Sequence, residues 1–453
     1  MIPGLSAHPG GGFSWIAAST FLMAASCVAA FAWALAFHEF SILLFFVVFG
    51  AMGLLITDPL TRVYFMLAYA CNILFALAWG WYQVKNGSGF FYFSDEQAYY
   101  TLSRSLAEDF IRGSSATLPS SVAFPGYFYL NAGLFFLAER VGDMSPVILR
   151  ISNAFAGALI APAVYHLARR FESEKKTSLP HQSAVLCALF PVLIYFSGMG
   201  LRDIWITSMT LWILRFQVRR EEKMPEWIAS IAIILLVLGI GMMRTFSLLP
   251  IAAFFAYLLL ASRNSPFNLL AKTVVFLSLP AAAVWIYESM NLGLLIEIYT
   301  EQLLDHSSEG SLGSALLRLP EGIKEAVLFC YTVFFPVPPV HELVPASLFV
   351  GIGNVIWYAV VPVSILGMVA ALKSNDRNAK LCKGLIVMVV ATMLGVALIT
   401  IDLRHKLQAY PVALIFCVYA LHHASHHRIR QVLLAMMLVG ANLLPLYLFM
   451  KIT

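Results

Sequence analysis

The sequence predicts an all-α, polytopic membrane protein with about thirteen transmembrane helices, plus amphipathic juxtamembrane helices in its outer loops. Of the 453 residues, 60% are hydrophobic and 12% are charged, whereas a soluble domain carries roughly 25% charged residues. The hydrophobic residues come in runs of about 16 to 25, the length that crosses a hydrocarbon core about 30 Å thick. A transmembrane β-barrel would instead show short segments of alternating hydrophobicity.

Fifteen apolar runs mark the expected helices, and no soluble domain interrupts them. The first run is long enough to remain as a span, so no cleavable signal peptide is expected. We expect a catalytic membrane module over 1–290 and, in the same membrane domain, a second outer loop and further helices over 291–453. The runs cover 13–37, 41–57, 62–83, 124–142, 146–167, 183–201, 204–219, 227–243, 246–262, 270–289, 323–340, 347–372, 384–401, 407–423 and 431–449.

Basic loops set the expected orientation. Lysine and arginine mark cytoplasmic loops, and the sides alternate only if two runs fail to cross. We assign 124–142 and 323–340 as re-entrant or interfacial, because each carries proline near one end and adjoins a polar loop. Thirteen spans then place the N-terminus inside and the C-terminus outside. The basic loops are 169–176, 219–223, 263–272, 373–383 and 428–430.

The predicted topology gathers unusual charged residues on the outer face. Charges at the edge of the hydrocarbon are energetically unfavourable and usually functional. The net charge of +5 lies mostly in short loops and does not indicate a nucleic-acid partner. The six cysteines show no paired spacing, so neither a disulfide framework nor a zinc site is expected. The outer segments are 84–123, 202–203, 244–245, 290–322 and 402–406.

The segment 93–110, FSDEQAYYTLSRSLAEDF, is the first long polar stretch. Ser94 and Gln97 have the spacing of a capping box, and an apolar stripe at four-residue spacing predicts an amphipathic helix along the membrane surface. That stripe consists of Leu102, Leu106 and Phe110.

Two adjacent carboxylates, Asp95 and Glu96, lie in the first turn of this helix. Partial desolvation beside aromatic residues would raise the pKa of a carboxyl and suit it to act as a general base on a sugar hydroxyl. The alternative is that acidic residues simply favour a helix N-terminus.

The ordered motifs over 90–215 resemble the GT-C superfamily of integral-membrane glycosyltransferases. They are DEQAYY at the start of a membrane-surface helix, FPGYFYLNAGLFFL after it, and Arg150 in SPVILRISNAFAG. The resemblance implies that Asp95 or Glu96 is the catalytic base and that the donor is a sugar on a polyprenyl phosphate or diphosphate. It also implies that Tyr99, Tyr100 and Arg150 take part in substrate binding.

The turn Gly200-Leu201-Arg202-Asp203 links two spans directly. Arg202 is a candidate to bind a phosphate oxygen, and Asp203 to orient that arginine or act as a second acid. A second outer-loop acid also fits the GT-C pattern, in which it holds a metal or the acceptor. The alternative is an ion pair at a helix boundary.

Further cations on the predicted outer face are candidates to bind the donor phosphate. A dense basic outer turn departs from the positive-inside tendency, and a diphosphate would explain it. The alternatives are that Arg244 snorkels from its span and that Arg318 is an exposed loop charge. The candidates are Arg244, Arg318, Arg404, His405 and Lys406.

The expected function is therefore transfer of a sugar or oligosaccharide from a polyprenyl-linked donor to a glycan or lipid acceptor on the periplasmic face of a bacterial-type inner membrane. A polymerase of cell-envelope polysaccharide fits best, and a ligase would use the same chemistry. The alternative is a flippase or transporter of lipid-linked glycans, which predicts an internal inverted repeat. No metal site or cofactor is expected, and a need for a divalent cation is left open.

Overall fold

The computed structural model describes residues 15–87, 89–115, 117–119, 122, 124–171, 178–219, 225–261, 320, 322–334, 344–373, 379–399 and 403–452. Within these residues the secondary structure is helical throughout, without a strand. The predicted all-α class is therefore confirmed for this part of the chain. The predicted span 270–289 and Arg318 lie outside the described residues.

Six described segments are long and apolar enough to cross a membrane, as a protein of several spans requires. A seventh is a bent pair, Leu179–Leu189 and Pro191–Ser197, with 52° between its two helices. The proline at 191 removes a backbone donor and explains the break. The six segments are Trp15–Phe37, Arg62–Lys85, Val147–Arg169, Glu226–Met243, Pro345–Lys373 and Ala379–Ala397.

The helices form two compact units that interleave along the chain. Unit 1 comprises Met1–Ala123, Tyr127–Pro162 and Leu193–Leu201, and unit 2 comprises Phe124–Gly126, Ala163–Val192 and Arg202–Thr453. The boundary falls inside α7 (Ile160–Arg169) and α9 (Pro191–Ser197).

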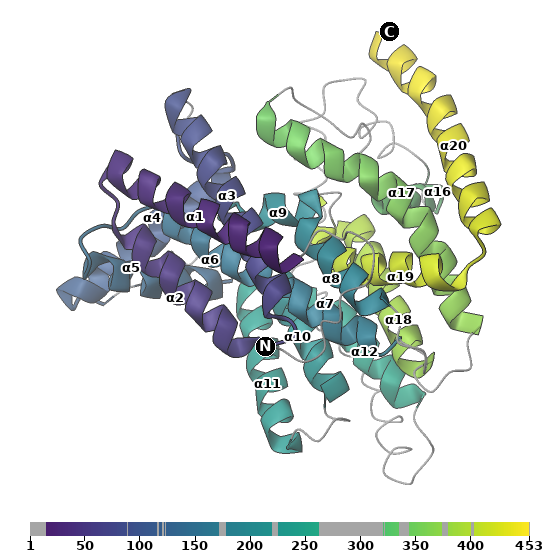
Figure 1. Ribbon diagram of the computed structural model, residues 1–453, viewed down its shortest axis with the longest axis horizontal. Coiled ribbons are helices and arrows are strands. Elements are labelled where there is room, and N and C mark those ends of the chain that lie inside the picture. The colour runs from purple at the N-terminus through teal and green to yellow at the C-terminus, as the bar shows by residue number, and fades with distance from the viewer. Residues whose placement is uncertain are drawn as a thin grey trace. The chain divides into compact units, whose positions relative to one another are not determined.

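Unit 1 is built around α3, which packs against both α1 and α6, while α2 also contacts α6. The helices α1, α2 and α3 lie side by side (Figure 1). Close approach requires glycine at position 53, because a Cβ there would lie 1.8 Å from the ring of Phe65. The helices of this unit are α1 (Trp15–Phe37), α2 (Ser41–Ile56), α3 (Arg62–Lys85), α4 (Ser94–Arg112), most of α5 (Gly126–Glu139) and α6 (Val147–Ala158).

Unit 2 is centred on α19, which is buried from Tyr410 to Ala420. It packs closely against α17, where a Cβ at Gly367 would lie 2.0 Å from the Phe416 carbonyl oxygen. The helix α17 also runs beside α20 (Figure 1). The elements are α8 (Leu179–Leu189), α10 (Asp203–Arg219), α11 (Glu226–Met243), η2 (Thr245–Leu248), α12 (Leu249–Leu260), α16 (Ile323–Phe334), α17 (Pro345–Lys373), α18 (Ala379–Ile399), η3 (Leu403–Lys406), α19 (Tyr410–His423) and α20 (His426–Ile452).

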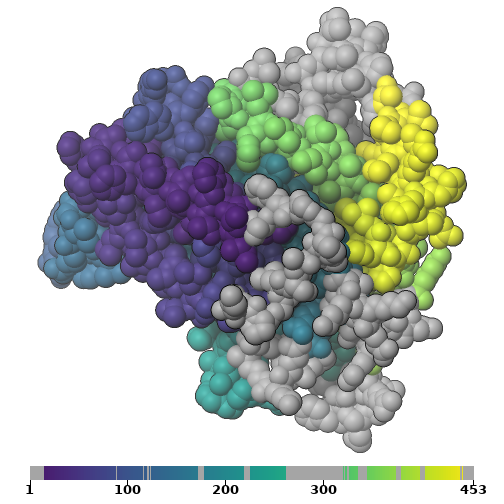
Figure 2. All heavy atoms as spheres, viewed as in Figure 1, coloured from purple at the N-terminus to yellow at the C-terminus, as the bar shows by residue number. Residues whose placement is uncertain are grey.

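Apolar side chains cover the outer faces of several helices. On α11, Ile234, Leu235 and Leu238 are each more than half exposed, and atoms of α1 and α20 lie on the surface seen in Figure 2. Continuous apolar surfaces of this kind are unfavourable in water and favourable against lipid tails. The chain thus has the helices and the surface of a multi-span membrane protein.

The two runs predicted not to cross form short helices. The helix α5 has 14 residues and α16 has 12, both below the roughly 20 residues that a spanning helix needs. Helix length does not distinguish these two runs, because α2 with 16 residues and α19 with 14 are predicted to cross; the re-entrant or interfacial assignment and the total of thirteen spans stay predictions.

The polar helix α4 forms as predicted, but the predicted capping box is wrong. Phe93 is its N-cap, and no side chain caps the helix, so the capping box does not form. Of the predicted apolar stripe, Leu106 is buried and Phe110 is 43% exposed, which is compatible with contact with lipid, while Glu96 is fully buried. The buried residues of the helix are Glu96, Tyr99, Ser103, Leu106 and Ala107.

Candidate functional site

Glu96 and Arg150 form a fully buried ion pair in unit 1, at 0% exposure each. Arg150 donates from Nε to Glu96 Oε1 at 2.8 Å and from Nη2 to Oε2 at 3.2 Å. Glu96 Oε1 also accepts the Gly200 amide at 2.9 Å, and Oε2 accepts the Tyr92 amide at 3.4 Å. Both carboxylate oxygens are therefore engaged, as a buried charge requires.

The Arg150 guanidinium has further partners from the end of α3 and the loop after it. Its Nη2 donates to Gln83 Oε1 at 3.0 Å and to the Phe90 carbonyl at 2.7 Å. The Phe90 ring lies under the guanidinium, 4.0 Å from ring centroid to Cζ, a cation–π contact. Arg150 thus joins α6, α3, α4 and the start of the polar segment.

Asn153, one turn after Arg150, fixes the backbone just before Arg202. Its Nδ2 donates to the carbonyls of Met199 and Leu201 at 2.5 and 2.6 Å, and its Oδ1 accepts from Tyr127 Oη at 3.0 Å. Since α6 carries Arg150 and Asn153 on neighbouring positions of one face, a single helix holds both the first turn of α4 and the segment 199–201.

These contacts bear on the roles assigned to Glu96, Arg150 and Tyr99. Both Glu96 oxygens accept hydrogen bonds from protein groups, so Glu96 is not placed to act as a base, whereas Arg150 Nη1 is buried and has no hydrogen-bond partner among the described residues. Tyr99 is also buried, with its ring 4.8 Å from that of Tyr127. Asp95, in contrast, is partly exposed, so it is the better placed of the two acids to act as the base. Tyr100 is partly exposed and donates from Oη to the Met144 carbonyl at 3.2 Å.

A second buried ion pair lies in unit 2, between Asp203 and Arg244. Arg244 Nη1 donates to Asp203 Oδ1, and each residue is 4% exposed. Asp203 begins α10, whose N-terminus favours a negative charge. Arg244 occupies an extended break between α11 and η2 (φ −169°, ψ 102°), which frees its side chain from the helix.

Three more basic residues surround this pair, which brings together the cations predicted to act jointly. Burial alone would raise the pKa of the Asp203 carboxyl, but the charge of Arg244 outweighs it, with Arg404 and Arg202 adding to the effect. The pKa of Asp203 falls to about 2 as a result. The carboxylate is thus ionised at neutral pH, which makes Asp203 an organiser of arginines rather than a proton donor.

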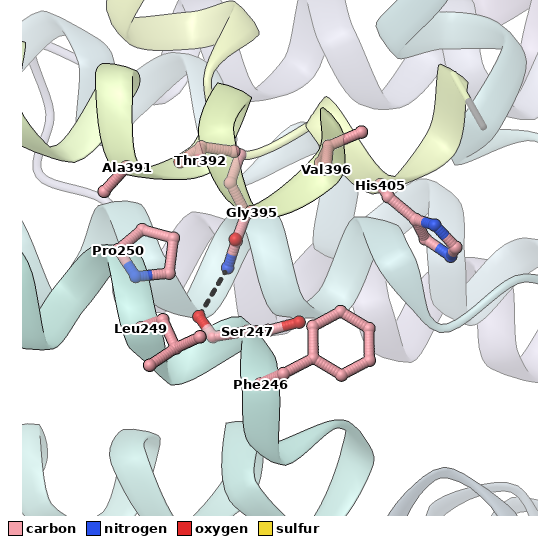
Figure 3. Close-up of a pocket in the computed structure, with 10 residues that line it drawn as sticks. Phe246, Ser247, Leu249, Pro250, Ala391, Thr392, Gly395, Val396 and His405 are labelled. Carbon is pink, nitrogen blue, oxygen red and sulfur yellow. Dashed lines mark hydrogen bonds between the residues drawn. The ribbon is translucent and has the colours of Figure 1, made fainter. Parts of the chain in front are cut away.

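A small cavity adjoins the cluster formed by Arg202, Asp203, Arg244, Arg404 and His405. Its volume is about 30 Å³, and His405 and Phe246 lie at one end of it (Figure 3). Gln408 Nε2 donates to the Ser247 carbonyl at 3.3 Å, the dashed line in Figure 3, and to Thr210 Oγ1 at 2.9 Å. These bonds fix the turn after η3 against α10 and η2.

Lys406 faces away from this cluster, contrary to the expectation that it binds phosphate with Arg404. It is fully buried, and Nζ donates to the Thr332 carbonyl at 2.8 Å. The rings of Trp357 and Tyr410 lie 5.8 and 5.7 Å from Nζ. Lys406 therefore anchors η3 to α16.

The sequence prediction missed three amides that hold these clusters: Gln83, Asn153 and Gln408. A signal was available for Asn153, because it follows Arg150 by three residues in an otherwise apolar run and so shares its face. Asp402 lies outside the described residues. Among the residues that the structure describes, no three His, Cys, Asp or Glu side chains are grouped as metal ligands.

No protein-family model matches this chain, and no curated protein matches its sequence.

Proposed function

We propose that the chain is a GT-C-type membrane glycosyltransferase that uses a polyprenyl-linked sugar donor. The observation that carries the proposal is the convergence of Arg202, Arg244 and Arg404 around one carboxylate in unit 2. Counted over these four described residues alone, three guanidinium groups and one carboxylate sum to a formal charge of +3 − 1 = +2. An excess of positive charge at a partly buried site favours an anionic ligand, and guanidinium groups suit phosphate oxygens.

In the proposed reaction the cluster binds the phosphate or diphosphate of the donor. The acceptor hydroxyl gives its proton to the Asp95 carboxylate and forms a bond to the anomeric carbon. The bond from that carbon to the phosphate oxygen breaks, and its electron pair stays on the phosphate. The leaving group gains negative charge, which nearby guanidinium groups stabilise. The acceptor is a glycan or lipid, as in polysaccharide assembly.

The proposed topology has thirteen spans, with the clusters at the periplasmic face of an inner membrane. Contacts within unit 1 support it. Ser145 Oγ donates to Glu39 Oε2 at 2.7 Å, and the Ser41 amide donates to Asp143 Oδ2 at 3.0 Å. Had the run 124–142 crossed the membrane, the segment 143–145 and the loop at 38–41 would lie on opposite sides.

Contacts at the predicted cytoplasmic ends of unit 2 support the same assignment. Arg170 Nη2 donates to the Val218 carbonyl at 3.0 Å, and His422 Nε2 lies 2.9 Å from Gln182 Oε1. These residues all belong to helix ends that the basic loops place inside.

Reporter fusions check the sidedness directly. We expect fusions after Ser115 and after Leu403 to report the outer face, because both follow an odd number of spans. A fusion after Arg170 is the matched control and is expected to report the cytoplasm. Opposite signals from the first two fusions would overturn the topology.

Donor binding tests the function. We expect Arg404→Gln to weaken binding of a polyprenyl-diphosphate-linked sugar on the order of 10- to 100-fold, the effect of losing one charge-assisted hydrogen bond. The measurement is a titration of the purified protein in detergent, with thermal unfolding as the check on folding.

The matched control is Arg112→Gln, because Arg112 is exposed on α4 and pairs only locally with Glu108. Its donor affinity is expected to equal that of the wild type. Unchanged affinity in Arg404→Gln would remove the phosphate role of the cluster. Donor binding without any sugar transfer to acceptors would favour a flippase over a transferase.

A further inference from the structure

His405 is a buried histidine at the junction of the cation cluster and the cavity. It is 8% exposed, and its Nδ1 has no hydrogen-bond partner among the described residues. Its ring meets that of Phe246 edge-on, with 6.3 Å between centroids, and Arg244 lies on the same phenyl ring at 5.2 Å. A buried polar nitrogen without a partner is unfavourable. The position of this nitrogen in a charged cluster indicates a functional role for His405.

The cavity beside His405 is lined mostly by apolar residues, and Ser247, Thr392 and Gln408 supply polar groups to it. Its volume of about 30 Å³ gives room for about two water molecules. It is too small for a sugar, so it does not hold the donor itself. It does give His405 a route by which water can exchange a proton. The lining residues are Phe246, Ser247, Leu249, Pro250, Ala391, Thr392, Gly395, Val396, His405 and Gln408.

The charged groups around His405 decide whether it carries a proton. Burial lowers its pKa well below the usual range, Arg244 lowers it further, and Asp203 raises it, with Arg404 and Arg202 also lowering it. The residues that α12 and α18 contribute to the cavity are all uncharged. Without a ligand, His405 is therefore neutral, because a proton would add to the +2 of its neighbours.

We propose that His405 takes up a proton when an anion binds at this cluster. The inference rests on the proposed anion-binding role of the cluster and adds a coupling to it. A dianion would cancel the formal charge of +2 and remove the repulsion that keeps the imidazole neutral. The extra proton then gives Nδ1 a hydrogen to donate, either to the anion or to water in the cavity.

The sign of the pH dependence follows from linkage. Anion binding raises the pKa of His405 toward or above its ordinary value of about 6.5, so the bound state holds more protons than the free state. Affinity therefore rises as pH falls between the bound-state and free-state pKa values, by at most about tenfold per pH unit for one proton.

The experiment uses sulfate as the probe, because it stays dianionic through the neutral range and brings no titration of its own. Calorimetric titrations of the full-length protein in two buffers of different ionisation enthalpy give the number of protons taken up. We expect the wild type to take up a proton on binding sulfate, and His405→Gln to bind sulfate with no uptake and less than about a twofold change in affinity between about pH 7.5 and 5.5.

The matched control is His427→Gln, since His427 is exposed at the start of α20; it should keep the wild-type proton uptake. Sulfate binding with no proton uptake in the wild type would overturn the coupling alone, and this result does not depend on whether a variant folds. Uptake that persists in His405→Gln would overturn the assignment to His405. Absence of sulfate binding to the wild type would overturn both the coupling and the anion-binding role in the proposed function.

Discussion

Replacing Arg150 with methionine is expected to lower the free energy of unfolding by about 3–5 kcal/mol. The change leaves the Glu96 carboxylate fully buried without its counter-ion, and removing one partner of a buried pair is far more damaging than removing both. Gln83 and the Phe90 carbonyl would also lose the donor they share. Denaturant or thermal unfolding in detergent, followed by tryptophan fluorescence, measures the effect.

Two controls separate lost pairing from a general effect of removing arginine. Arg104 forms an exposed ion pair with Glu108, so Arg104→Met should change stability by about 1 kcal/mol or less. The double variant Glu96→Gln with Arg150→Met should be more stable than Arg150→Met alone, because no buried charge remains unpaired. Equally small changes in the free energy of unfolding for Arg150→Met and Arg104→Met would contradict the structural role assigned to Arg150.

Asp95→Asn is expected to slow sugar transfer by roughly 10²- to 10⁴-fold, the usual contribution of a general base. Its effect on stability should be small, about 0.3–1 kcal/mol, since the carboxylate is partly exposed and lies at the N-terminus of α4. The measurement is initial rate at saturating donor and acceptor, alongside a melting curve.

The neighbouring acid provides the contrast. Glu96→Gln should show mainly reduced stability, because it breaks the pair with Arg150, and at a temperature where it is folded it should retain sugar transfer. Asp95→Asn with wild-type turnover would exclude Asp95 as the base. Loss of turnover in a folded Glu96→Gln would show that the buried pair does more than hold α4.

The helices could be predicted from the sequence because apolar runs indicate local structure directly. The runs 62–83 and 227–243 correspond closely to α3 (Arg62–Lys85) and α11 (Glu226–Met243), whereas the break at Pro191 was missed, because 183–201 was predicted as one span. The convergence of Arg202, Arg244 and Arg404 was also predictable. Each lies in a turn that the basic loops assign to one face, although the loops are far apart along the chain.

The hydrogen-bonded and ionic pairs could not be predicted from the sequence, since they depend on packing between residues far apart in the chain. Glu96 and Arg150 are 54 residues apart, and the sequence around either residue does not indicate which residue it pairs with. The direction of Lys406 was missed for a different reason. A 3₁₀ helix has three residues per turn, so consecutive side chains diverge by about 120°, and Lys406 faces α16 while His405 faces the cavity.

Gly200 restricts which sequences can contain the Glu96–Arg150 pair. A Cβ at position 200 would lie 2.9 Å from Glu96 Cγ and 3.0 Å from Oε1, so any larger residue would displace the carboxylate from the guanidinium. Related chains that keep the acid and the arginine should therefore also keep glycine, whereas chains that lose one should be free to vary at all three positions. This three-point signature is more discriminating than the short DEQAYY motif for recognising distant relatives.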